Sequence, residues 1–185
     1  NRPGGAGVVG TELVARAQAG DLDSFNQLVS RWERPIYALA YRTLGREEEA
    51  RDVVQEAFMR AYRGLKAFKG EAKFSSWLYR ITLNLCRDWM RRERRTPIVS
   101  VPEGVDPIDL ADRQVAPTES VEDLVARREM SAAVQLAMAE LPEEQRTAIM
   151  LKEYHGLTFQ EIAEQLDCPL STVKTRLYQG LTVLR

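Results

Sequence analysis

The sequence predicts an all-α protein made of two small helical bundles joined by a flexible acidic linker. Apolar residues recur at helical spacing along most of the chain, and no segment alternates apolar and polar residues as a strand would. One stretch breaks the helical period with four prolines among acidic residues. The 185 residues are therefore divided into a disordered Gly-rich tail (1–10), a first bundle (11–95), a linker (96–119) and a second bundle (120–185).

The first bundle is expected to contain four helices, because its apolar residues follow the helical period in four stretches. Gly20 and Gly45 end the first two helices, and Asp21 is placed to cap the second. Acidic residues in the first turn of the third helix match the positive end of the helix dipole. The four helices are expected at about 13–20, 21–45, 47–65 and 74–95.

The second bundle is expected to begin with two further helices and to end in a helix-turn-helix. Helical periodicity resumes over 120–141, Pro142 is suited to the first position of the next helix, and Gly156 ends that helix. Thr158 and Glu161 then have the spacing of a capping box, which marks the start of another helix.

The last helix has one apolar and one polar face. A break at 167–169 precedes it, and Ser171 is its expected N-cap. Val173 and Leu177 lie on the apolar side, which leaves a polar face that can enter a DNA major groove. An ordinary helical hairpin with a solvated polar face is the alternative. The polar face comprises Lys174, Thr175, Tyr178, Thr182 and Arg185.

The formal net charge of −1 conceals two opposite charge clusters. Residues 80–95 contain six arginines against two acidic residues, whereas residues 96–123 contain seven acidic residues against one arginine. Phosphates respond to a local cluster, because screening limits charge interactions to roughly 8–10 Å. A solvated charged face is the alternative, but this excess on one helix favours nucleic-acid contact. The basic stripe comprises Arg80, Asn84, Arg87, Arg91 and Arg94/Arg95.

Two other surfaces stay ambiguous when judged from the residues alone. Phe68, beside Lys69 in the loop before the fourth helix, can either stack on an unpaired base or anchor the loop to the core. The polar face formed by Asp52, Gln55 and Glu56 would repel phosphates. That face is therefore either a protein-binding surface or a solvated one.

The composition argues against several classes of function. Two distant cysteines and the single His155 support neither a disulfide framework nor a zinc site. No catalytic constellation or phosphate-binding loop is recognisable, so no catalytic residue, metal or cofactor is expected. No apolar run approaches the length needed to cross a bilayer. We expect no membrane insertion and a cytoplasmic location.

Five sequence blocks, in this order, resemble the extracytoplasmic-function (ECF) sigma factors of the sigma-70 family of bacterial RNA polymerase. The resemblance covers residues 11–95 and 120–185, which correspond to the family's regions 2 and 4. The blocks are Asp52-Val53-Val54-Gln55-Glu56-Ala57-Phe58, the stretch 74–84, Arg91-Arg92, Leu141-Pro142-Glu143-Glu144-Gln145-Arg146 and the terminal helix-turn-helix.

The resemblance implies a protein that binds core RNA polymerase, through its β′ clamp and β flap, and directs promoter-specific transcription initiation. It also implies promoter DNA as a partner, recognised at the −10 and −35 elements, and an anti-sigma factor as a regulator. An acidic linker would follow the basic nucleic-acid channel of the polymerase.

Residue roles are implied in the same way, position by position. Gln179 stands where many relatives have arginine, and Gly180 is expected to weaken the last helix by up to about 1 kcal/mol relative to alanine. The polymerase-binding residues would be Asp52, Gln55 and Glu56. The −10 residues would be Phe68, Lys69, Arg80, Asn84, Arg87, Arg91 and Arg92. The −35 residues would be Ser171, Lys174, Thr175, Arg176, Tyr178 and Gln179.

Two other functions fit parts of the sequence. A homodimeric helix-turn-helix repressor or activator would need neither the basic stripe on the fourth helix nor the acidic face on the third. A metal-dependent nuclease would need clustered carboxylates facing the basic stripe, and Asp88 and Glu93 form no such cluster with a recognisable partner.

Overall fold

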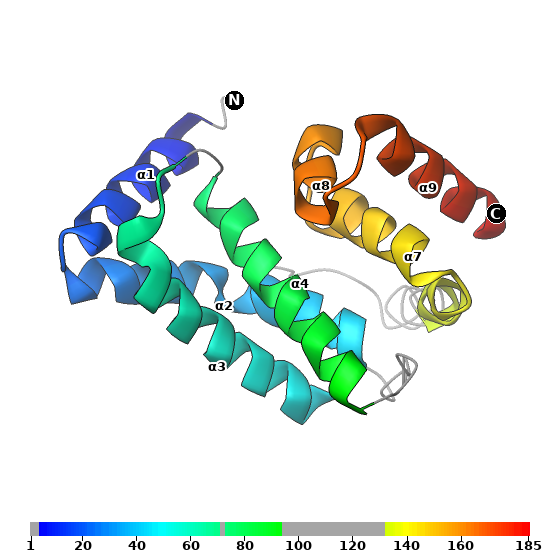
Figure 1. Cartoon of the computed structure of the whole chain (residues 1–185), viewed down its shortest axis with the longest axis horizontal. Helices are drawn as coiled ribbons and strands as arrows, with labels where there is room; N and C mark the ends of the chain where they lie inside the picture. The colour runs from blue at the N-terminus through cyan, green and yellow to red at the C-terminus, as the bar shows by residue number, and fades with distance from the viewer. Residues whose placement is uncertain (1–3, 71–72, 94–131) are drawn as a thin grey trace, which may run out of the picture.

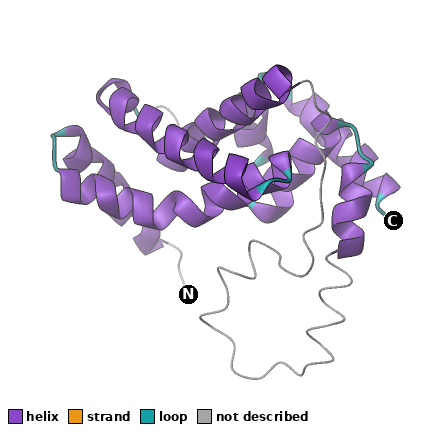
Figure 2. Cartoon of the chain, turned by 90° about the horizontal axis from the view of Figure 1, so that it is seen from below, coloured by secondary structure: helices purple, strands orange, loops and turns teal. Residues whose placement is uncertain are grey.

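The computed structural model describes residues 4–70, 73–93 and 132–185, and all regular structure in these ranges is helical (Figure 2). This confirms the predicted fold class. An N-terminal bundle of four helices lies beside a smaller C-terminal bundle (Figure 1). The predicted linker and the predicted helical residues 120–131 lie outside the described residues.

The N-terminal bundle follows the predicted caps. It contains α1 (Gly4–Gln18), α2 (Leu22–Leu44), α3 (Glu47–Gly64), the short turn η1 (Leu65–Ala67) and α4 (Phe74–Glu93). Asp21 caps α2 by accepting a hydrogen bond from the backbone of Asp23. Gly45 ends α2 with a φ of 70° and donates its N–H to the Tyr41 carbonyl at 2.7 Å.

The helix α1 starts earlier than predicted. Residues 4–10 are helical, whereas the sequence predicted a disordered tail over 1–10; residues 1–3 lie outside the described part of the chain. Leu13 and Val14 are buried and fix the helix to the bundle. Extending a helix that is already anchored adds one hydrogen bond per residue, which offsets the low helix propensity of the glycines.

The C-terminal bundle comprises helical residues 132–139 and four further elements. The predicted capping box is confirmed: Thr158 Oγ1 accepts from the Glu161 N–H at 3.1 Å, and Glu161 Oε2 accepts from the Thr158 N–H at 2.8 Å. Asp167 ends that helix in the left-handed region, with a φ of 49°. The elements are α7 (Glu143–Ile149), the π-helical turn η2 (Met150–Tyr154), α8 (Phe159–Leu166) and α9 (Leu170–Val183).

Two helix starts differ from the prediction for one reason. Pro142 was expected as the first helical residue and Ser171 as an N-cap, but α7 begins at Glu143 and α9 at Leu170. Pro142 and Pro169 are the N-cap residues, with ψ of 142° and 148°. An N-cap contributes its carbonyl group to the helix, so the missing N–H of proline is no disadvantage at that position.

The core of the N-terminal bundle is formed by one side of each helix. On α4, Leu78, Thr82 and Cys86 are completely buried. The Thr82 hydroxyl donates to the Leu78 carbonyl at 2.9 Å, so this polar group is satisfied within its own helix. Burial raises the pKa of the Cys86 thiol to about 12, which makes it an inert core residue at neutral pH.

Gly180 is buried in the contact between α9 and α7, in addition to lowering the helix propensity of α9. A Cβ atom at this position would lie 2.6 Å from Ile149 Cδ1 and 3.4 Å from Gln145 Cβ. Ile149 is itself buried, so its side chain has little room to move away.

We therefore predict that Gly180→Ala lowers the melting temperature of the protein, although alanine is the better helix former. The gain in helix propensity is about 1 kcal/mol, whereas overpacking a buried contact costs about 1–3 kcal/mol. Thermal unfolding followed by circular dichroism measures the difference, and Gly20→Ala is unsuitable as a control because Gly20 has a φ of 100°. A melting temperature above that of the wild type would contradict the packing role.

Candidate binding surfaces

The acidic face predicted on α3 is exposed to solvent. Asp52 and Gln55 are exposed, and Glu56 is half-buried and pairs with Arg60, whose Nε lies 3.1 Å from the carboxylate. Because the three predicted residues stand at helical spacing, α3 presents them together on one side.

An apolar groove of about 900 Å³ lies between α2 and α3, next to this face. Gln55 belongs to its lining, which connects the groove to the acidic face. Leu22, Met59 and Tyr62 border the groove and are 57%, 44% and 56% exposed. Large apolar side chains gathered at one exposed site are typical of a protein-binding surface.

Leu22 and Tyr62 belong to this surface, although none of the sequence patterns described above includes them. Leu22, Phe25 and Val29 follow one another at helical spacing on α2, and all three line the groove. The Phe25 and Tyr62 rings pack edge to face, with centroids 5.0 Å apart. This second apolar stripe is the signal in the sequence that indicates the groove.

The basic stripe on α4 lies on the side of the helix away from the core. Arg80, Asn84, Arg91 and Arg92 are exposed, and Arg87 is half-buried. Asp88 lies within the stripe and pairs with Arg91 at 2.5 Å, so this acidic residue neutralises part of the positive charge. Arg94 and Arg95 lie outside the described residues.

Phe68 packs into an aromatic cluster at the start of α4. Its ring is half-buried, with its centroid 4.9 Å from that of Trp77 and 6.2 Å from that of Phe74. The Gln18 side chain donates to the Phe68 carbonyl at 2.7 Å, which ties the loop to α1. Phe68 therefore anchors its loop, and base stacking by this ring stays a prediction; Lys69 is exposed beside it.

The helix-turn-helix presents the predicted polar face on α9. Ser171, Lys174, Thr175, Tyr178 and Gln179 are exposed, while Val173 and Leu177 are buried on the opposite side. Tyr178 is 60% exposed, so most of its ring is accessible to a partner on that face. The geometry fits a recognition helix that meets a duplex through its outer face.

Arg176 is held at the edge of that face. It is half-buried, its guanidinium lies 3.2 Å from the Glu144 carboxylate, and Nη1 lies 3.7 Å from Cys168 Sγ. A hollow between the start of α7 and α9 includes Arg176, Thr175 and Gln179 in its lining. Arg176 therefore has to break its ion pair with Glu144, or to contact Glu144 and a phosphate at the same time, in order to bind a phosphate.

Other kinds of site find little support in the described residues. Over 4–70, 73–93 and 132–185, no three His, Cys, Asp or Glu side chains gather as a metal site requires. None of the helices in these ranges is both long enough and apolar enough to cross a bilayer.

The chain matches two family models in the order of its two bundles. Sigma-70 region 2 matches residues 28–96, and Sigma-70 region 4 matches residues 131–184. The ECF RNA polymerase sigma factor SigW of Bacillus subtilis is 38% identical over 93% of this chain and 92% of that protein.

Two solved structures are also similar to the chain. The structure of CnrH in complex with the cytosolic domain of CnrY has a TM-score of 0.68 at 28% identity, over 95% of this chain and 94% of CnrH. The sigma factor RpoE of Bartonella quintana, solved in complex with the anti-sigma factor NepR, has a TM-score of 0.66 at 21% identity, over 88% of this chain and 95% of that one. The second likeness concerns the fold alone.

The two kinds of contact expected on α9 lead to a prediction. Lys174→Ala and Tyr178→Ala should change which duplex sequences are bound, at about 1–3 kcal/mol for a base-specific contact. Arg176→Ala should weaken all sequences alike and flatten the salt dependence, because a phosphate contact carries no sequence information. Selection from a randomised duplex library at two salt concentrations separates these effects. An altered motif for Arg176→Ala, with unchanged motifs for the other two, would contradict the assignment.

Proposed function

The chain belongs to the extracytoplasmic-function group of the sigma-70 family, whose members direct transcription initiation at promoters, and we propose that it does so through three separate surfaces. One surface binds core RNA polymerase, one opens and reads the −10 element, and one reads the −35 element as duplex. The observation that supports this proposal is the presence of two exposed faces with basic and polar side chains, on α4 and α9, in a chain that also has an exposed apolar and acidic surface on α2 and α3.

We assign polymerase binding to the docking surface, defined as Asp52, Gln55 and Glu56 with the adjacent groove between α2 and α3. Acidic side chains there are unsuited to DNA, whereas the exposed apolar side chains of Leu22, Met59 and Tyr62 beside them suit a protein partner. The β′ clamp is the proposed partner for this surface, and the β flap for the second bundle.

We assign −10 recognition to α4 and the loop before it. Arg80, Asn84 and Phe68 would form the pocket for an extruded base, with Lys69 beside them. Arg87, Arg91 and Arg92 lie farther along the same helix and would hold the strand backbone. The −35 element would be read by Lys174, Thr175, Tyr178 and Gln179, with Ser171 and Arg176 on phosphates.

The remaining expectations form part of the same proposal. The domains would be 11–95 for region 2, 96–119 for the linker and 120–185 for region 4, and the matched ranges 28–96 and 131–184 are consistent with them. The protein would act in the cytoplasm as a binding subunit without catalytic residues of its own. An anti-sigma factor is the expected regulator, because the sequence resembles a family whose members are commonly restrained by such a partner.

Reconstituted transcription tests the function directly. The purified chain is added to core RNA polymerase with a library of promoter sequences, and transcripts are sequenced from their 5′ ends. Initiation at a shared pair of elements, absent with core polymerase alone, is expected. Operator binding as a dimer, without any promoter-dependent transcripts, would favour the repressor alternative instead.

The docking surface gives a prediction with a matched control. The double variant Gln55→Ala and Glu56→Arg should lower the affinity for core polymerase about tenfold or more, as expected for the centre of an interface. The control is Gln27→Ala with Glu12→Arg, because Glu12 forms the same kind of pair with Arg16 that Glu56 forms with Arg60. Equal affinities of both double variants in a binding titration would remove this surface from the mechanism.

The −10 surface gives a prediction about promoter opening. Asn84→Ala and Phe68→Leu should each reduce strand opening, since losing the amide's hydrogen bonds to a base edge or losing one base stack costs about 1–3 kcal/mol. Leucine at position 68 keeps an apolar anchor against Trp77 and removes only the aromatic face. Permanganate reactivity of −10 thymines measures opening, and duplex −35 binding serves as the control. Normal thymine reactivity in both variants would disprove the assignment.

A further inference from the structure

The C-terminal bundle packs directly on the N-terminal one. Leu157, Ile162 and Ala163 are buried in the same apolar cluster as the core residues of α1 to α4. Met150 and Leu177, in contrast, belong to a separate cluster within the C-terminal bundle. One buried apolar cluster therefore spans both bundles, and separating the bundles would expose part of it.

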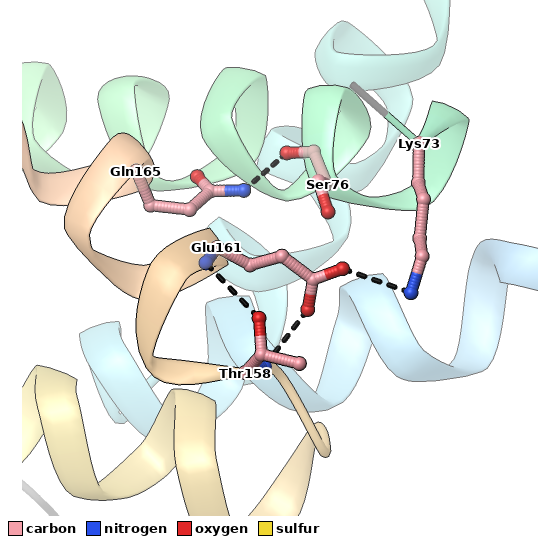
Figure 3. Close-up of polar contacts among 5 residues, drawn as sticks. All are labelled: Lys73, Ser76, Thr158, Glu161 and Gln165. Carbon is pink, nitrogen blue, oxygen red and sulfur yellow. Dashed lines mark hydrogen bonds and ion pairs between the residues drawn. The ribbon is translucent and has the colours of Figure 1, made fainter. Parts of the chain in front are cut away.

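Gln165 is the buried polar residue of this contact. It lies on α8 beside the apolar Leu166, yet Gln165 is the more buried of the two. Its Nε2 donates a hydrogen bond to the carbonyl oxygen of Ser76 on α4 (Figure 3). Buried amides are tolerated in protein interiors where they find such partners. The contact between the bundles thus satisfies the Nε2 donor of Gln165, whereas its Oε1 is buried without a hydrogen-bond partner among the described residues.

An ion pair lies beside this hydrogen bond. Lys73 Nζ is 2.9 Å from Glu161 Oε1, while Glu161 Oε2 accepts from the backbone of Thr158 (Figure 3). Glu161 therefore caps α8 and holds the start of α4 at the same time. The capping box that begins the helix-turn-helix is also a contact point for the other bundle.

Two ring contacts extend the interface to α2 and to the next turn of α4. The Arg42 guanidinium lies 4.0 Å from the ring centroid of Tyr154. The ring centroids of Tyr79 and His155 are 5.1 Å apart. Burial, and then the charge of Arg42, lowers the pKa of His155 to about 4. The imidazole is therefore neutral at pH 7 and adds no second positive charge near Arg42.

This closed arrangement cannot read two promoter elements at once. Elements one and a half duplex turns apart are separated by roughly 50 Å, whereas α8 and α4 touch each other here. The first helix of a helix-turn-helix crosses the DNA backbone when the second enters the groove. In this structure that first helix lies against Lys73 and Ser76, directly after the loop that carries Phe68 and Lys69.

We propose that the free protein is held closed by the Gln165–Ser76 and Lys73–Glu161 contacts, and that this closed form is autoinhibited until polymerase and promoter separate the bundles. The Lys73 side chain is 72% exposed, so its ion pair is weak and readily broken. The inhibition rests on the function proposed above, whereas the closure itself is independent of it.

Energy transfer between single dye pairs in the free, full-length chain tests the closure. Dyes are attached at Ala67→Cys and Glu164→Cys, two exposed positions on different bundles that stand within six residues of the Lys73–Glu161 contact, in a Cys168→Ser background; Cys86 is buried and stays unlabelled. Gln165→Glu replaces the donor by a carboxylate facing the Ser76 carbonyl. Gln160→Glu makes the same change at an exposed position of α8. Lys73→Glu places a second carboxylate next to Glu161 and alters no buried residue. Lys66→Glu makes the same change at another exposed lysine and is its control.

We expect one high-transfer population for the parent and for both controls, and at least a twofold increase in low-transfer molecules for Gln165→Glu and Lys73→Glu. Identical distributions for variants and controls, with helicity intact, would overturn the closure. At limiting sigma factor, Gln165→Glu should then give at least threefold more initial promoter complexes than Gln160→Glu. Opening without that gain would overturn the inhibition while leaving the proposed function intact, since the parent would still initiate transcription.

Discussion

The burial of one side of α4 is the constraint on which the other features depend. Leu78, Thr82 and Cys86 fix the helix against its neighbours, and this fixes the opposite side, where Arg80 and Asn84 are exposed. A rigid helix presents polar groups more accurately than a loop does. The start of the same helix also supplies the carbonyl that Gln165 contacts, so one element connects the core, the basic stripe and the second bundle.

The contacts between the bundles contribute more to the specificity of the closed arrangement than to its stability. A neutral hydrogen bond contributes only about 0.5–1.5 kcal/mol and an exposed ion pair about 0–1 kcal/mol. Leaving a buried amide such as Gln165 without its partner costs about 1–3 kcal/mol, so misaligned packing is penalised. One buried apolar cluster spans both bundles and a second lies within the C-terminal bundle alone, so separation exposes part of the shared cluster. A weak but specific contact of this kind suits a protein that must exchange an internal partner for external ones.

Much of the fold was predictable because local chemistry decided it. Asp21, Gly45 and the Thr158–Glu161 capping box act on their own helix ends, so their spacing was enough. Gln165 and Gly180 were not predictable in the same way, since each is explained by a neighbour distant in sequence: Ser76 for one and Ile149 for the other. The docking groove was missed because Leu22 and Tyr62 look like core residues until the packing of α2 on α3 leaves them exposed.

The central claim is that one chain reads two separated DNA elements with bundles that close on each other when free. The distance between spin labels at Ala67→Cys and Glu164→Cys, two exposed positions close to the contact between the bundles, measured by double electron–electron resonance, tests it most directly. The free chain should give a single short distance, and the complex with core polymerase and promoter should give a distance longer by tens of ångströms, since the two elements lie roughly 50 Å apart. The same distance in both states would contradict the account.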